Sequence, residues 1–137
     1  MMKKFWLIKT EPDNDWSWKE QLEKNIESWD GVRNFAARKN LQSMKKNDQA
    51  FFYHSGKDKC IVGIVKIVKE AYPDPSDKSG KFVMVDVKTF KSLKKPVFLS
   101  EIKKIKELDK MVLVNNSRLS VQPVTEREWK IICEIGK

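Results

Sequence analysis

The segment Cys60–Ala71 limits the possible folds of this chain more than any other. It is rich in isoleucine and valine, and it is apolar at both alternating sets of positions. A strand with one exposed face alternates between apolar and polar residues, whereas a strand covered on both faces is apolar throughout. The pattern therefore predicts a central strand with packing layers on both sides. Tyr72-Pro73-Asp74-Pro75 ends this strand, because proline cannot continue a hydrogen-bonded ladder.

The sequence predicts four more strands around the central one. In Lys81–Phe90, alternate valines point one way, while Met84, Asp86 and Lys88 point the other, as in a half-exposed strand. The other predicted strands are Phe5–Lys9, Gln49–His54 and Leu119–Val124.

Two capping boxes mark predicted helix starts. Ser17 is followed three residues later by Glu20, and Thr125 is followed in the same way by Glu128. The predicted helices are Trp18–Asn25, Arg33–Met44, Ser100–Lys106 and a C-terminal helix that packs Trp129 inward. Strands mixed with helices indicate an α+β domain with a strongly bent or closed sheet. We expect one domain over residues 1–137, since a chain of 137 residues suits one domain.

The chain is strongly basic, and its charge favours an anionic partner. Lys and Arg total 28 against 19 Asp and Glu, which gives a formal net charge of +9. Nucleic acid is the leading candidate for such a partner. The alternative is a lysine-rich composition without a specific partner, because 24 of the 28 basic residues are lysine.

The cysteines and the N-terminus predict a cytoplasmic protein. Cys60 and Cys133 lie far apart, with no zinc-type spacing around either, so we expect free thiols in a reducing compartment. The apolar run Phe5–Ile8 is too short for a signal-peptide core, and no later segment approaches a membrane span. We therefore expect no membrane association, and a monomer.

Sequence motifs for catalysis, metal binding and cofactor binding are weak. His54 is the only histidine, and its neighbours Ser55, Asp58 and Cys60 share its strand end or loop, where catalytic triads are rare. A structural histidine is the favoured interpretation. The carboxylates show no metal-ligand spacing, and Gly56-Lys57 lacks the upstream glycine of a phosphate loop. We expect neither a metal nor a cofactor.

Arginine and tryptophan are placed as recognition residues often are. Three of the four arginines, Arg33, Arg38 and Arg118, fall in two short polar and aromatic segments. Arginine offers a planar fork for phosphate contacts and stacking, although an ion pair, for example with Asp30 or Glu11, is an equal alternative for any one of the three. The tryptophans that flank polar loops, and could stack on a base or pack in the core, are Trp16, Trp18 and Trp29.

Several ordered segments together resemble the EVE domain family. The resemblance begins with Trp6-Leu7-Ile8-Lys9-Thr10-Glu11-Pro12 and continues with the segment from Trp29-Asp30-Gly31 to Ala36-Ala37-Arg38. It extends through Phe52-Tyr53-His54-Ser55, Tyr72-Pro73-Asp74-Pro75 and Arg118-Leu119-Ser120-Val121-Gln122-Pro123-Val124, so it spans nearly the whole chain. The sequence departs from the family at Phe35-Ala36, where members often carry Tyr-Gln.

The resemblance implies a fold and a function. The implied fold is PUA-like, a bent or closed mixed barrel of about five to six strands with helices at its rim. The family is similar to the thymocyte nuclear protein family and is kin to YTH and ASCH domains. YTH domains read a methylated RNA base in an aromatic cage, and EVE domains are taken as readers of modified bases in DNA or RNA. The resemblance therefore implies a nucleic-acid-binding domain without catalysis.

The matching motif positions supply candidate site residues. We expect Trp29 and Tyr53 to form the walls of a base pocket. Thr10, Asn34 and Ser120 would read the base edge, and Arg33 and Arg118 would bind phosphate or order the pocket. The complete expected set is Lys9, Thr10, Trp29, Arg33, Asn34, Tyr53, His54, Ser55, Arg118 and Ser120.

Two other functions remain open at this point. ASCH relatives include small amidohydrolases, for which Lys9, Thr10 and Glu11 are the candidate catalytic residues. In a strand, Thr10 faces away from the other two, so the three converge only if the strand ends there. The second alternative is a protein-interaction module, whose oligonucleotide binding would be weak and insensitive to salt.

Overall fold

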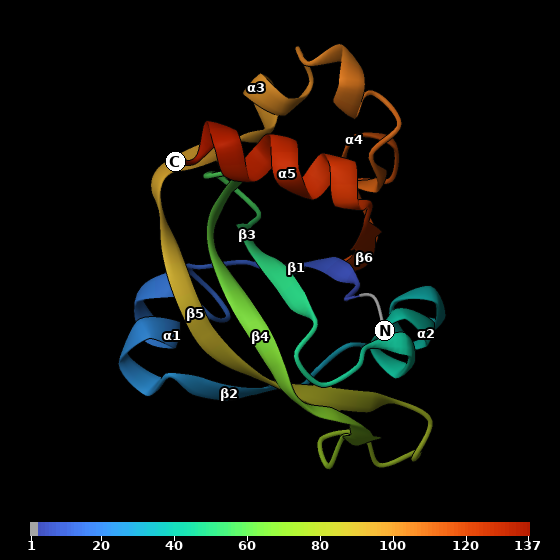
Figure 1. Ribbon diagram of the computed structural model, residues 1–137. Coiled ribbons are helices and arrows are strands. Elements are labelled where there is room, and N and C mark those ends of the chain that lie inside the picture. The colour runs from blue at the N-terminus through green and yellow to red at the C-terminus, as the bar shows by residue number, and fades with distance from the viewer. Residues whose placement is uncertain (1–2) are drawn as a thin grey trace.

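The computed structural model describes residues 3–137, which form a six-stranded mixed sheet (Figure 1). The strand order is β2-β5-β4-β3-β1-β6, in which β1 and β3 are parallel and every other neighbouring pair is antiparallel. The strands are β1 (Phe5–Thr10), β2 (Ile26–Trp29), β3 (Gln49–His54), β4 (Cys60–Pro73), β5 (Val83–Phe98) and β6 (Val121–Val124).

The first half of β4 lies near the middle of the sheet and is covered on both faces, as the apolar run predicts. The hairpin of β4 and β5 is long, and its register shifts at several points, which lets the two strands bend together along the molecule (Figure 1). Within residues 3–137, β2 and β6 are the sheet edges and are not paired with each other. The α+β class and the bent sheet are confirmed, but the sheet is open rather than closed.

Helices begin where the capping boxes predict. In α1 and α5 the side chains of Ser17 and Thr125 accept hydrogen bonds from the backbone N–H groups of Glu20 and Glu128. The helices are α1 (Trp18–Lys24), α2 (Phe35–Ser43), α3 (Leu99–Ile102), α4 (Val112–Asn115) and α5 (Glu126–Ile135), with a short 3₁₀ helix at Lys106–Leu108.

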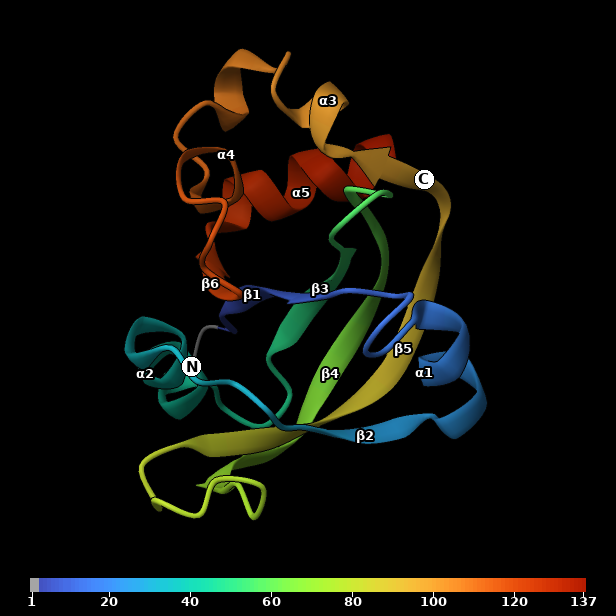
Figure 2. The ribbon, with the colours of Figure 1, turned by 180° about the vertical axis from the view of Figure 1, so that it is seen from behind.

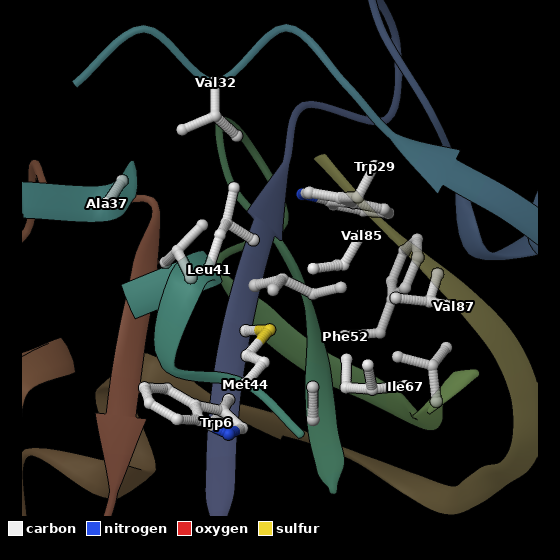
Figure 3. Close-up of a cluster of buried hydrophobic side chains, with 14 of the residues drawn as sticks. Trp6, Trp29, Val32, Ala37, Leu41, Met44, Phe52, Ile67, Val85 and Val87 are labelled. Carbon is white, nitrogen blue, oxygen red and sulfur yellow. The ribbon is translucent and has the colours of Figure 1, made fainter. Parts of the chain in front are cut away.

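The sheet has a hydrophobic core on each face. The first core contains the side chains of Trp18 from α1 and Leu41 from α2 against Phe52 of β3, and Figure 3 shows much of this cluster. The second core contains Phe51 and Trp129, whose rings stack with centroids 3.8 Å apart, beneath α5. Figure 2 shows from behind that α3, α4 and α5 gather at one end of the molecule, away from α2.

A close contact across the first core fixes α1 on the sheet. A Cβ atom at Gly63 of β4 would lie 2.2 Å from the ring of Trp18, so only glycine fits there. The indole N–H of Trp18 donates to the Ser92 hydroxyl of β5 at 2.9 Å. Trp18 therefore ties α1 to two strands at once.

The structure adds elements that the sequence did not predict. β2 was missed because it has four residues and its first, Ile26, is 46% exposed, so it carries little hydrophobic pattern. The predicted strand Lys81–Phe90 continues to Phe98, because its lysine-rich second half is held by pairing with β4. The predicted helix Ser100–Lys106 is one turn of α helix at Leu99–Ile102. No helix among residues 3–137 is long and apolar enough to cross a membrane.

Candidate nucleic-acid interface

A pocket of about 200 Å³ opens where the end of β1, the loop before α1, β2 and the segment leading into α2 meet. This volume is below the roughly 300–1,000 Å³ of sites for drug-sized ligands, which suits a single small group. The lining residues come from both ends of the chain and are Lys9, Thr10, Asp15, Trp16, Glu27, Ser28, Trp29, Asp30, Gly31, Val32, Arg33 and Ser120.

Two tryptophans line this pocket. Trp16 is half-buried, and its indole N–H donates to the Gln21 side chain at 2.9 Å. Trp29 is 7% exposed and packs edge-on against Phe52, with ring centroids 5.5 Å apart. Figure 3 shows Trp29 among the side chains of the first core. Trp16 therefore presents more ring surface to a ligand, and Trp29 serves mainly as buried support.

Thr10 positions Trp16. The Thr10 hydroxyl donates to the Trp16 carbonyl at 2.7 Å and accepts from the Trp16 N–H at 3.2 Å. The Thr10 side chain is therefore occupied by the backbone, and its predicted contact with a base edge is replaced by a role in holding the loop. By contrast, the Ser120 hydroxyl is half-buried in the pocket lining and has no hydrogen-bond partner within residues 3–137.

Three carboxylates give the pocket an acidic rim, although the protein is basic and Lys9 and Arg33 also belong to the lining. Asp15, Glu27 and Asp30 all contribute to its lining. Burial raises the pKa of Asp15, and the nearby negative charges of Asp30, Glu20 and Glu27 raise it further. Sequence reasoning missed this feature, because the three carboxylates come from separate segments and only the fold brings them together.

Arg33 lines the pocket and orders the segment around it. Its guanidinium donates to the Asp74 carboxylate at 3.1 Å and to the Ser76 hydroxyl at 2.9 Å. The same Asp74 oxygen accepts the Gly31 N–H at 2.8 Å. Arg33 thus joins the pocket lining to the loop between β4 and β5, and its ion-pair partner is Asp74 rather than Asp30 or Glu11.

Tyr53 does not form a wall opposite Trp29. Consecutive strand residues point to opposite faces of the sheet, so Phe52 enters the first core and Tyr53 enters the second. Tyr53 is 3% exposed, and burial raises its pKa to about 12. The structure therefore contradicts the predicted aromatic pair and places Trp16 beside Trp29 instead.

Four other predicted residues lie outside the pocket lining, and three of them have structural partners. The His54 ring accepts a hydrogen bond from the backbone N–H of Trp18 at 3.0 Å and pairs with Asp58, so His54 anchors the start of α1. The N–H of Ser55 donates to the Thr10 carbonyl at 2.8 Å. The side chain of Asn34 caps α2 by accepting the Ala37 N–H at 2.9 Å, which uses its carbonyl oxygen. Arg118 is exposed, two residues before Ser120.

The side chains of the three candidate catalytic residues, Lys9, Thr10 and Glu11, do not converge on one site. Burial lowers the pKa of Lys9, but its ammonium group donates to the Ser117 carbonyl at 2.7 Å and lies 5.6 Å from the centre of the Tyr53 ring. The Thr10 hydroxyl is bonded to Trp16. The Glu11 carboxylate accepts the Asn14 N–H at 3.0 Å, within its own loop. This arrangement gives the amidohydrolase alternative no support.

Comparison with known proteins gives consistent relatives. The EVE domain family model matches residues 4–135. Mouse thymocyte nuclear protein 1 is 38% identical in an alignment that covers 96% of this chain and 73% of the mouse protein. The solved structure of Rpa0253 from Rhodopseudomonas palustris is 51% identical with a TM-score of 0.91, over 97% of this chain and 92% of that one.

Two further solved structures contain nucleic acid. Human THYN1 in complex with DNA containing 5-methylcytosine is 35% identical with a TM-score of 0.92, over 98% of both chains. The YTH domain of Zygosaccharomyces rouxii MRB1, in complex with N6-methyladenosine RNA, is 19% identical with a TM-score of 0.58, over 98% of this chain and 87% of that one. The second likeness shows a shared fold, as the predicted kinship with YTH domains requires.

Proposed function

Because the chain belongs to the EVE domain family, we propose that it binds nucleic acid and reads a modified base in the pocket lined by Trp16 and Trp29. The observation that carries the proposal is this small pocket, with one half-exposed tryptophan, in a chain whose human relative was solved with DNA containing 5-methylcytosine. DNA with 5-methylcytosine is therefore the first ligand to test.

The pocket offers what a base reader requires. A base must leave its stack to be inspected, which costs a few kcal/mol, and stacking on an aromatic ring recovers about 1–3 kcal/mol. Trp16 supplies that ring, held in place by Thr10 and Gln21. Ser120 and the acidic rim supply groups that can bond the donor edge of an amino-bearing base.

We propose separate roles for the ten predicted residues. Ser120 contacts the base, Trp29 supports the pocket, and Arg118 binds phosphate from its exposed position near Ser120. The residues that act by holding the pocket or its surroundings in shape are Lys9, Thr10, Arg33, Asn34, Tyr53, His54 and Ser55. We further propose that residues 1–137 act as one monomeric domain in the cytoplasm or, in a eukaryotic cell, the nucleus.

The test is a binding measurement on matched DNA duplexes. Each duplex carries either one 5-methylcytosine or cytosine at the same place, and affinity is measured at two salt concentrations. We expect tighter binding to the methylated duplex. We also expect log affinity to fall with log salt by about 0.9 for each phosphate contacted. Equal affinity for both duplexes would reject the reading of this modification, and a flat salt response would reject nucleic-acid binding.

A further inference from the structure

Four planar groups form a column beside the pocket. The Cζ atom of Arg33 lies 5.6 Å from the centre of the Phe82 ring, and Phe82 stacks on Phe35 with ring centroids 5.1 Å apart. The Cζ atom of Arg38 lies 4.9 Å from the centre of the Phe35 ring. The column joins the start of α2 to the residues just before β5. We call Arg33, Phe82, Phe35 and Arg38 the stacked column.

The column is exposed at Phe35 and adjoins the pocket at Arg33. Phe35 is 58% exposed, more than any other large hydrophobic side chain among residues 3–137. Arg33 belongs to the column and also to the pocket lining, as do Gly31 and Val32 just before it. The column therefore extends from the pocket lining to the exposed side chain of Phe35.

The chemistry of the column fits a nucleotide rather than an apolar partner. Arg38 donates to the Lys81 carbonyl at 3.0 Å, which helps to hold its guanidinium over the Phe35 ring. Two exposed lysines adjoin column residues in sequence: Lys39 follows Arg38, and Lys81 precedes Phe82. Aromatic rings and guanidinium planes stack on any base, and neighbouring lysines attract the phosphates.

We propose that Phe35 and Arg38 bind the nucleotide next to the base held in the pocket, with the outer face of the Arg38 guanidinium stacked on its base and the Phe35 ring beneath that guanidinium. This inference rests on the proposed function, because it requires a base in the pocket. It adds a second nucleotide to the binding site and makes the pocket and the stacked column one continuous interface. The Nε atom of Arg38 is buried without a hydrogen-bond partner within residues 3–137, so the guanidinium offers a base its plane rather than this nitrogen.

The experiment separates the two parts of the interface by ligand size. Binding is measured for the nucleoside 5-methyl-2′-deoxycytidine, and for a single-stranded trinucleotide that places the same base between two thymidines. We expect the wild-type protein to bind the trinucleotide more tightly. Phe35→Ala and Phe35→Leu should weaken trinucleotide binding by at least about five-fold, the lower limit for loss of one stacked base, and leave nucleoside binding within about two-fold.

Two matched variants control the measurement. Phe98→Ala removes another exposed phenylalanine, 43% exposed, beside α3 at the other end of the molecule (Figure 1), and should bind both ligands like wild type. Phe35→Trp keeps a flat ring and should retain trinucleotide binding. Phe35→Leu keeps an apolar contact with Phe82, so a loss shared with Phe35→Ala reflects the missing ring.

Each contrary outcome has one meaning. If Phe35→Ala binds the trinucleotide like wild type, or if wild type binds both ligands equally, the stacked column is not part of the interface and the proposed function stands. If wild type binds neither ligand, the proposed function fails, and this inference fails with it.

Discussion

The Thr10 hydroxyl bonds both backbone polar groups of Trp16, donating to the carbonyl at 2.7 Å and accepting from the N–H at 3.2 Å. Five residues lie between the two, so this pair closes the loop that carries the exposed ring of the pocket. Because Thr10 is 3% exposed, water cannot easily replace its hydroxyl.

Thr10→Val should loosen this loop. Valine has nearly the same shape but makes neither hydrogen bond, and an unpaired buried backbone group costs about 1–3 kcal/mol. We expect a lower free energy of unfolding by about that amount, measured by urea denaturation, and weaker binding to methylated DNA. Thr10→Ser keeps the hydroxyl and is the matched control. A Thr10→Val protein with wild-type stability and affinity would show that the loop does not depend on this pair.

Trp16→Ala and Trp29→Ala should have opposite profiles. Trp16 is half-buried, so its loss should weaken DNA binding by about 1–3 kcal/mol with a smaller change in stability. Trp29 is 7% exposed in the first core, so its loss should reduce stability by about 3–5 kcal/mol. Thermal unfolding and binding titrations on the same samples distinguish the two. Similar stability losses in both variants would contradict the assignment of Trp16 as the more exposed wall.

Asp15→Asn should stabilise the protein at pH 7. Burial, followed by repulsion from Asp30, raises the pKa of Asp15 above its ordinary value of 3.8, so the folded state disfavours the charged carboxylate. The penalty is present above the raised folded pKa and disappears below the unfolded value, where the group is neutral in both states. The melting temperature of Asp15→Asn should therefore exceed that of wild type at pH 7 and match it near pH 3. Glu23→Gln, on an exposed position of α1, serves as the charge-matched control.

Asp74 should contribute to unfolding in acid. Burial acts to raise its pKa, but hydrogen bonds from Ser76, Gly31 and Arg33 outweigh burial and hold the pKa below its ordinary value of 3.8. Such a group stabilises the folded state above the unfolded pKa, and this contribution is lost as pH falls through the folded pKa. Melting temperature measured from pH 6 to pH 2 should fall steeply below about pH 4. Asp74→Asn should be less stable at pH 6 and show a shallower fall, and an unchanged slope would exclude Asp74 as a cause.

Local sequence patterns predicted most of the sheet and both capped helices. The apolar segment from Cys60 and the capping boxes at Ser17 and Thr125 involve residues close together in the sequence. Their patterns are therefore visible without knowledge of the fold. β2 was not visible in this way, because it is held by its pairing with β5 rather than by its own residues.

The candidate site was predicted only in part, for a physical reason. Five of the ten predicted residues line the pocket, namely Lys9, Thr10, Trp29, Arg33 and Ser120. Motif positions could not show which face of β3 its residues occupy. The motif position alone predicts Tyr53 as a wall with Trp29, but consecutive residues of β3 point to opposite faces, and Tyr53 belongs to the second core. The acidic rim depends on contacts between separate segments, and no spacing within the sequence indicates it.

The pairing of β1 with β6 determines when the pocket can form during synthesis of the chain. Phe5 lies opposite Val124, and the pocket takes Thr10 from one end of the chain and Ser120 from the other. During synthesis the N-terminal part leaves the ribosome first, and it holds Trp16 and Trp29 while the strand that completes the site is still absent. A nascent chain stalled before Val121 should therefore fail to recognise a modified base, so that recognition begins only after β6 has been synthesised.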